Sequence, residues 1–202
     1  MTKASGGATS DEELARRARA GDAPAFDALV NRYQERVYRL SRRLTGNRAD
    51  AEDALQDTFL QVFRRLSTFR GESRFSTWLY RIATNTALMA CRSRARRRTE
   101  PLDAYLPQFD RGGRHARDVD HARASRADEI LEQRRLARAV QSALQRLPEL
   151  YRVPFVLRDL EDLDTAEVAS VLKATPAAVR QRVHRARLMM RGYLSHLVGV
   201  EP

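Results

Sequence analysis

The chain has 202 residues, of which 37 are lysine or arginine and 26 are aspartate or glutamate, so its formal net charge is +11. This basic surplus favours a polyanionic partner such as nucleic acid, whereas the single cysteine excludes an internal disulfide and a thiolate metal cluster. No segment approaches the length of a membrane-spanning helix and the histidines lack ligand spacing, so we expect a cytoplasmic protein without metal, cofactor or membrane insertion.

The first half of the chain is predicted to be helical throughout. Ser10 and Glu13 form a capping box for a short helix, and Pro24 suits the first turn of a second helix that stops at Gly46. A third helix is expected from about residue 50 to 66, and a fourth from about residue 76 into the arginines at 92–98. The apolar repeat of the third helix predicts a buried face of Ala51, Ala54, Leu55, Thr58, Phe59, Val62, Phe63 and Leu66.

The outer face of the third helix carries an apolar residue among polar ones. Asp53, Gln56 and Asp57 lie on the same face as Leu60. Leu60 is either a stray surface leucine, which is common, or the anchor of a protein-docking surface. An acidic patch around one apolar residue on a basic protein is typical of a docking surface, but these residues alone leave both alternatives open.

The turn before the fourth helix is surrounded by aromatic residues. Phe69, Phe75, Trp78 and Tyr80 cluster around the sequence FRGES, and the helix continues into a run that includes Arg92, Arg94, Arg96 and Arg97. Aromatic rings can stack on unpaired bases while arginines bind phosphates. The alternative is that Phe75 and Trp78 simply belong to the core.

Composition changes after residue 98, and we expect a flexible linker at 99–127, with two prolines, a glycine pair and little apolar periodicity. A helix then ends at Pro148, two short helices follow near 150–159 and 165–173, and a last helix begins at Pro176. The predicted fold is therefore all-α, with two small helical domains at 1–98 and 128–202.

The C-terminal domain carries the pattern of a helix-turn-helix. Asp164 and Glu167 predict a capped helix, and a three-residue turn leads to Thr175 as the cap of the next. The inward face of that last helix is expected to be Val179, Val183, Ala186 and Met190. Its outward face carries Arg180, Gln181, Arg182, His184 and Arg185, and such side chains read base edges in the major groove. A solvated basic helix in an ordinary bundle is the alternative.

Two long strings resemble the extracytoplasmic-function (ECF) class of RNA polymerase sigma factors. Residues 50–85, DAEDALQDTFLQVFRRLSTFRGESRFSTWLYRIATN, are similar to region two of that family. Residues 147–191, which run from LPELYRVPF to RARLMMR, are similar to region four. The strings stand in the family's order, with a linker where the family has one.

The resemblance implies a role for each matched position. Asp53, Gln56, Asp57 and Leu60 fall where the family docks on the clamp helices of the polymerase β′ subunit. Phe69 and Asn85 match positions that frame a pocket for a flipped base of the −10 element, and the outward face of the last helix falls where the −35 element is read. The implied partners are promoter DNA, core RNA polymerase (β′ clamp helices and β flap) and an anti-sigma factor.

Two other classes of function compete with a sigma factor. A polymerase-independent helix-turn-helix regulator would explain DNA binding, but it would not explain the exposed face around Leu60. An enzyme acting on nucleic acid is not expected, because the sequence shows no phosphate-binding glycine loop, metal-ligand spacing or nucleophile–base pair.

Overall fold

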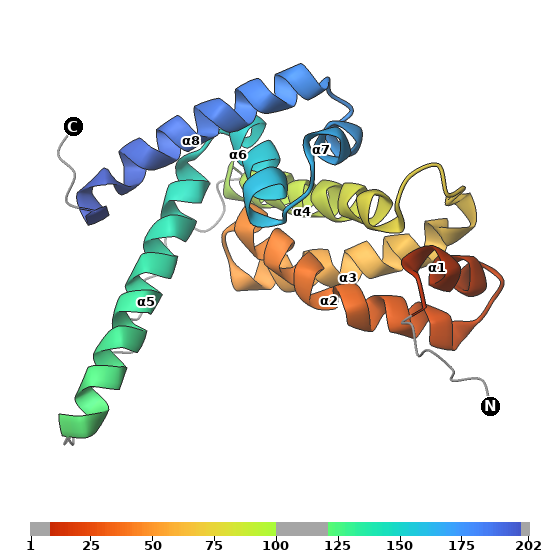
Figure 1. Ribbon diagram of the computed structural model, residues 1–202, viewed down its shortest axis with the longest axis horizontal. Coiled ribbons are helices and arrows are strands. Elements are labelled where there is room, and N and C mark those ends of the chain that lie inside the picture. Colours follow the sequence, from red (N-terminus) through yellow and green to blue (C-terminus); the bar gives the residue numbers. More distant parts are fainter. Residues whose placement is uncertain (1–8, 100–120, 199–202) are drawn as a thin grey trace, which may run out of the picture.

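The computed structural model describes residues 9–99 and 121–198, and within these ranges every regular element is helical (Figure 1). The all-α prediction is confirmed. The elements are α1 (Asp11–Arg19), α2 (Ala23–Thr45), α3 (Arg48–Arg65), the 3-10 turn η1 (Leu66–Thr68), α4 (Phe75–Thr99), α5 (His121–Arg146), α6 (Glu149–Phe155), the π-helical segment η2 (Val156–Leu160), α7 (Thr165–Leu172) and α8 (Pro176–Val198).

Local signals in the sequence account for the helix ends. The Ser10 hydroxyl accepts a hydrogen bond from the Glu13 amide at 3.2 Å, and the Asn47 side chain accepts one from the Asp50 amide at 2.8 Å. Gly46 ends α2 with a φ of 82°, a left-handed conformation that glycine adopts without a steric penalty. These caps satisfy backbone groups that would otherwise have no partner at the helix ends.

The N-terminal domain packs α1 to α4 around a core of aliphatic and aromatic side chains (Figure 1). The buried face of α3 is narrower than its apolar repeat predicts, because the neighbouring helices cover only part of the apolar stripe and leave Leu55 and Phe59 half-buried. The prediction that Phe63 is buried is wrong: its side chain is 66% exposed, and its ring packs edge-on against Phe26 with centroids 5.4 Å apart.

The C-terminal domain contains the predicted helix-turn-helix in α7 and α8. The Asp164 carboxylate accepts from the Glu167 amide at 2.8 Å, and the Glu167 carboxylate accepts from the Asp164 amide at 2.9 Å, which completes the capping box. Lys173 ends α7 in the left-handed conformation, with a φ of 51°, and the Thr175 hydroxyl accepts from the Ala178 amide at 3.2 Å to start α8. The capping box and the N-cap predicted from the sequence are therefore both present.

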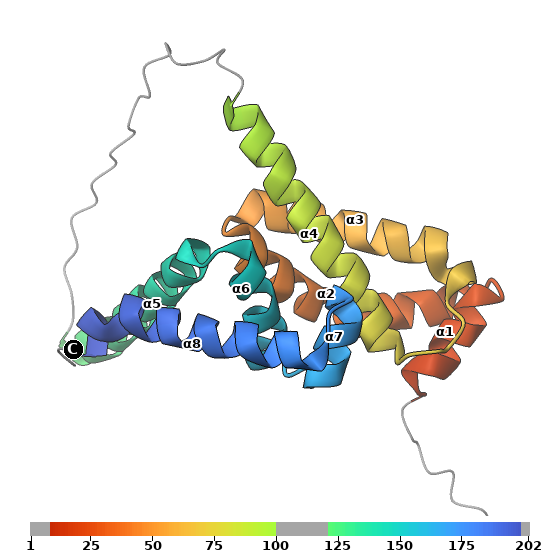
Figure 2. The ribbon, with the colours of Figure 1, turned by 90° about the horizontal axis from the view of Figure 1, so that it is seen from above.

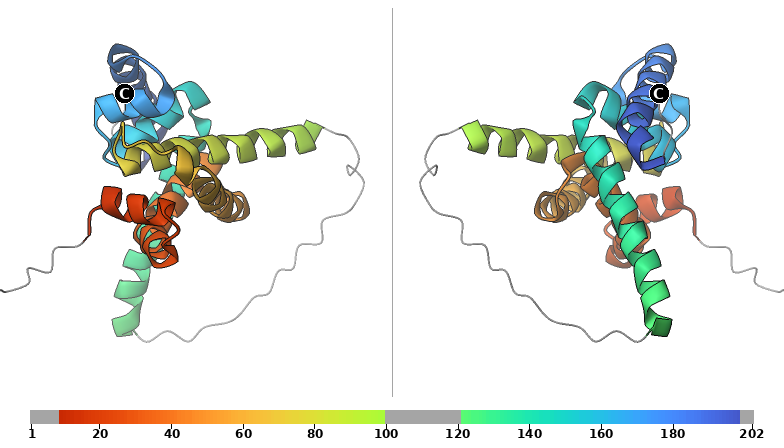
Figure 3. Two further views of the ribbon diagram at one scale, coloured as in Figure 1. Left: turned by 90° about the vertical axis from the view of Figure 1, so that its right-hand side faces the viewer. Right: turned by 90° about the vertical axis from the view of Figure 1, so that its left-hand side faces the viewer.

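The predicted linker extends too far at its C-terminal end. α5 begins at His121, inside the predicted linker 99–127, and residues 100–120 lie outside the described part of the chain. Residues 121–130 lack apolar periodicity, but their alanines, arginines and glutamate are good helix formers. The C-terminal end of α4 and the N-terminal end of α5 project from the body in different directions (Figure 3).

The two domains contact each other directly. α7 lies against α4, and the C-terminal part of α5 and the segment η2 lie against α2 (Figure 2). None of the helices in the described ranges is long and apolar enough to cross a membrane.

Candidate nucleic-acid interface

The last helix, α8, has the buried and exposed faces that its sequence predicts. The four inward positions Val179, Val183, Ala186 and Met190 are all buried in the core. On the outward side Arg180, Gln181, His184 and Arg185 are exposed and Arg182 is half-buried. α7 packs against α8, and the Thr175 cap fixes the first turn of α8, so the outward face lies on a helix that is anchored at its start.

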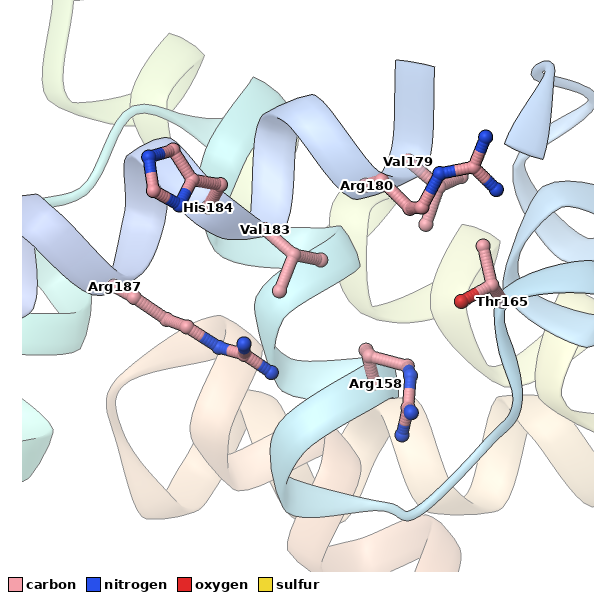
Figure 4. A pocket seen from close by; sticks show the side chains of 7 residues that line it. All are labelled: Arg158, Thr165, Val179, Arg180, Val183, His184 and Arg187. Carbon is pink, nitrogen blue, oxygen red and sulfur yellow. The ribbon is translucent and has the colours of Figure 1, made fainter. Parts of the chain in front are cut away.

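A basic cavity of about 330 Å³ lies beside this face, between α8, η2 and the start of α7 (Figure 4). Its lining includes Arg158, Arg180, His184 and Arg187. The Asp159 carboxylate accepts two hydrogen bonds from the Arg187 guanidinium, both at 2.7 Å, and so fixes that side chain. Asp159 balances the charge of Arg187, so Arg158 and Arg180 supply the positive charge of the cavity, in a place that suits a DNA backbone phosphate.

The aromatic residues before and within α4 form one cluster that belongs largely to the core. Phe75 is 1% exposed and Phe69 is 8% exposed, and their ring centroids are 5.6 Å apart. Trp78 is half-buried and packs on both rings, at 5.3 and 5.8 Å. Phe75 is thus not available to stack on a base in this arrangement, so the core alternative holds for it, whereas Trp78 keeps an exposed part.

A side chain of α1 binds the backbone at Phe69. The Arg19 guanidinium donates a hydrogen bond to the Phe69 carbonyl oxygen at 3.1 Å. A second cavity, of about 220 Å³, lies between α1 and this turn, and Arg16, Arg70 and Gly71 contribute to its lining. α1 therefore supports the turn that the resemblance associates with the −10 pocket.

The exposed face of α4 carries more basic residues than the sequence analysis singled out. Spacings of three or four residues bring Arg74, Trp78, Arg81, Asn85 and Arg92 to one face. Asn85 and Arg92 are exposed, as predicted. Arg74 and Arg81 were missed, although the helical repeat from Trp78 and Asn85 leads directly to them.

The arginines at the end of α4 differ in whether they already have a partner within the chain. Arg92 donates to the Glu149 carboxylate at 2.9 Å, and Arg94 donates to the Asp50 carboxylate at 3.4 Å. Arg96 is exposed, and the side chain of Arg97 lies outside the described residues. Two members of the run are thus already paired with carboxylates of the same chain.

The predicted docking residues share one exposed face of α3. Asp53, Gln56 and Asp57 are exposed, and Leu60 is 46% exposed. Phe63, one turn further along, extends the apolar part of this surface. We call these five residues the α3 face. A leucine and a phenylalanine three residues apart form a larger apolar anchor than a single stray leucine.

The single cysteine lies on α4 and is sheltered. Its thiol donates a weak hydrogen bond to the Leu44 carbonyl at 3.7 Å, and burial raises the pKa of Cys91 above its ordinary value. A raised pKa lowers the thiolate fraction at neutral pH, and thiolate is the reactive form. We therefore expect Cys91 in the folded chain to react with iodoacetamide at pH 7.5 several-fold more slowly than in urea. Mass spectrometry of timed samples measures this rate, and equal rates would contradict the sheltered environment.

Known proteins resemble the chain over both domains. The sigma-70 region 2 model matches residues 29–97 and the sigma-70 region 4 model matches residues 137–190. The RNA polymerase sigma-H factor of Pseudomonas aeruginosa is 36% identical over 179 residues, which cover 88% of this chain and 90% of the relative. The ECF RNA polymerase sigma-E factor of Haemophilus influenzae is 36% identical over 192 residues, covering 94% and 97%.

Solved structures share the fold. CnrH, solved in complex with the cytosolic domain of CnrY, superimposes with a TM-score of 0.67 at 26% identity and covers 93% of this chain and 99% of that one. The sigma factor RpoE of Bartonella quintana, solved with the anti-sigma factor NepR, gives a TM-score of 0.63 at 18% identity, covering 84% and 96%. The second likeness concerns the fold alone.

Proposed function

Since the chain belongs to the extracytoplasmic-function class of the sigma-70 family of RNA polymerase sigma factors, we propose a division of work between its two domains. The C-terminal domain reads duplex DNA at the −35 element, and the N-terminal domain binds core polymerase and captures the unpaired −10 strand. The chain acts as a specificity subunit of the polymerase in the cytoplasm and catalyses no reaction itself. The relatives do not favour a polymerase-independent regulator.

The observation that carries this proposal is the coincidence of an inward apolar face and an outward basic face on α8. Arg180, Gln181, His184 and Arg185 are exposed at the start of a helix held by a capped turn. Arginine bonds guanine and glutamine bonds adenine with two hydrogen bonds each in the major groove. The cavity lined by Arg158 and Arg180 suits a backbone phosphate at the edge of the same groove.

The N-terminal domain is proposed to bind the −10 strand at α4 and the preceding turn. Phe69 and Asn85 would frame the pocket for a flipped base, and Trp78 would offer its exposed part for stacking. The free energy lost in unstacking a base is offset by contacts in a preformed pocket, and the hydrogen bond from Arg19 keeps the Phe69 turn in place. The arginines at 92–97 are proposed to bind phosphates of the same strand.

The α3 face is proposed to dock on the β′ clamp helices, and the C-terminal domain on the β flap. The acidic Asp53 and Asp57 around an apolar anchor suit a partner surface with basic and apolar side chains. We further propose that an anti-sigma protein binds this chain, as NepR binds the RpoE protein of Bartonella quintana. Such a partner would compete with polymerase for the chain.

Replacing Arg185 with alanine tests the reading face. Loss of a side chain that bonds a base should weaken promoter binding by roughly 1–3 kcal/mol and relax preference at one −35 position. The measurement is binding of polymerase loaded with this chain to promoters that vary singly at each −35 and −10 position. Arg191→Ala, which removes an exposed arginine near the other end of α8, is the matched control. If the base preference is unchanged at every −35 position, Arg185 is not one of the residues that read the −35 element.

A further inference from the structure

One large apolar side chain of α4 faces solvent. Met89 is 66% exposed, whereas the other large apolar residues of this helix are buried or half-buried. Single exposed apolar residues are common on protein surfaces, so exposure alone assigns no role to Met89. The residues on the same side of the helix, however, are those proposed to bind DNA.

Met89 lies in the middle of a line of exposed residues along α4. Asn85 precedes it by four positions, Arg92 follows it by three and Arg96 by seven. Side chains at these spacings lie on one side of a helix, and all three neighbours are exposed. We call these four residues the α4 stripe, of which Met89 is the single apolar member.

Met89 belongs to the half of α4 that projects from the body of the molecule. The C-terminal half of this helix extends away from α7 (Figure 2). Arg81, one turn before Asn85, donates to the Ser170 carbonyl of α7 at 2.9 Å, so α7 contacts α4 before the α4 stripe begins. A nucleic-acid strand can therefore reach Met89 without displacing α7.

The spacing of the α4 stripe matches a strand that passes from Asn85 to the arginines. Each helical residue advances about 1.5 Å, so Met89 lies about 6 Å along the helix axis from Asn85. Successive nucleotides of one strand are about 3.4 Å apart in duplex DNA. A strand whose flipped base lies at Asn85 and whose phosphates lie at Arg92 and Arg96 therefore brings a base roughly one or two nucleotides away to Met89.

The chemistry of methionine limits what Met89 can recognise. Its thioether has no hydrogen-bond donor and is only a weak acceptor, so it does not suit the polar edge of a base. Thymine differs from the other bases in carrying a methyl group at C5, and apolar side chains contact this group. The flexible methionine chain adapts to such a contact, which removes apolar surface of both groups from water.

We propose that Met89 is a specificity-determining residue that contacts the C5 methyl group of a thymine in the −10 element. This thymine lies roughly one or two nucleotides from the flipped base, on the side of that base that faces Arg92 and Arg96. The role rests on the proposed binding of the −10 strand to α4 and adds a base preference to it. A stacking contact would tolerate all bases, whereas this contact depends on one methyl group.

Deoxyuridine, which lacks only the methyl group of thymine, tests the proposal. Polymerase loaded with this chain is bound to a promoter from which it starts transcription, and each −10 position of the non-template strand carries thymine or deoxyuridine in turn. At one position we expect deoxyuridine to weaken binding by the wild type about fourfold, which corresponds to one buried methyl group. Met89→Ala should bind the two bases equally at that position and keep the other −10 preferences.

Two variants serve as controls for this measurement. Met89→Leu keeps an apolar side chain of similar size and should keep the methyl preference. Leu136→Ala shortens an apolar side chain that is 56% exposed on α5 and should behave like the wild type. The fold should survive Met89→Ala, because the side chain is exposed and alanine is the best helix former.

The outcomes separate the role of Met89 from the function of the surface around it. The proposal is wrong if deoxyuridine has no effect at any position, or if its effect is the same in Met89→Ala. It is also wrong if Met89→Ala weakens binding to core polymerase, because Met89 would then contact protein instead of DNA. If the wild type shows no base preference anywhere in the −10 element, the proposed −10 function fails together with this role. A preference at other −10 positions without a methyl effect overturns the role of Met89 alone.

Discussion

Replacing Leu60 with aspartate should abolish most of the affinity of this chain for core RNA polymerase. Leu60 and Phe63 form the apolar centre of the α3 face, and removal of such an anchor typically costs about 2–4 kcal/mol of binding free energy, or roughly thirtyfold or more in affinity. The stability of the free chain should change little, because Leu60 is 46% exposed and lies outside the buried core. Fluorescence anisotropy of the labelled chain, titrated with core polymerase, measures the loss.

The control for this prediction is Met89→Asp. Met89 is 66% exposed on α4, so the substitution introduces the same charge at another exposed apolar position of the same domain. Met89→Asp should bind core polymerase like the wild type. If Leu60→Asp assembles normally with core, or if both variants lose binding equally, the docking surface lies elsewhere.

Replacing Phe75 with alanine should destabilise the N-terminal domain by about 3–5 kcal/mol. The Phe75 ring is fully buried, and its centroid lies 5.8 Å from those of Tyr33 and Trp78, so its removal leaves a cavity beneath the proposed −10 surface. Urea unfolding followed by circular dichroism measures the change. Promoter opening would then fall because the support of Trp78 is lost, and not because a base-stacking ring is missing.

An exposed phenylalanine of the same domain provides the comparison. Phe63→Ala removes a ring that is 66% exposed and packs edge-on with Phe26, and it should cost less than about 1 kcal/mol of stability. A small effect of Phe75→Ala, similar to that of Phe63→Ala, would mean that Phe75 leaves the core in solution and is free to meet DNA.

Local chemistry explains why the C-terminal domain could be predicted from the sequence. The capping box at Asp164, the cap at Thr175 and the four inward positions of α8 depend on neighbours within one or two turns, and all are found as expected. The exposed side of α3 followed from the same helical repeat. Phe63 was placed wrongly because the repeat identifies an apolar stripe but not how much of its width the neighbouring helices cover.

The contacts between the domains could not be predicted in this way. Arg81 and Ser170 are 89 residues apart, and Arg43 and Glu161 are 118 residues apart, with no periodic pattern joining them. When each helix is considered alone, polar residues of this kind are expected to face solvent. The pairing of Arg92 with Glu149 was not predicted either. The arginine run was expected to bind DNA phosphates, but part of it already binds carboxylates within the chain.

In vitro transcription tests the central claim most directly. Core polymerase lacking any sigma factor is incubated with this chain and fragmented genomic DNA, and the start sites of the transcripts are sequenced. We expect discrete start sites that share a −35 and a −10 element, that disappear with Leu60→Asp and that weaken with Arg185→Ala. If active core polymerase starts at the same places with and without the chain, the chain is not the promoter-specificity subunit proposed here.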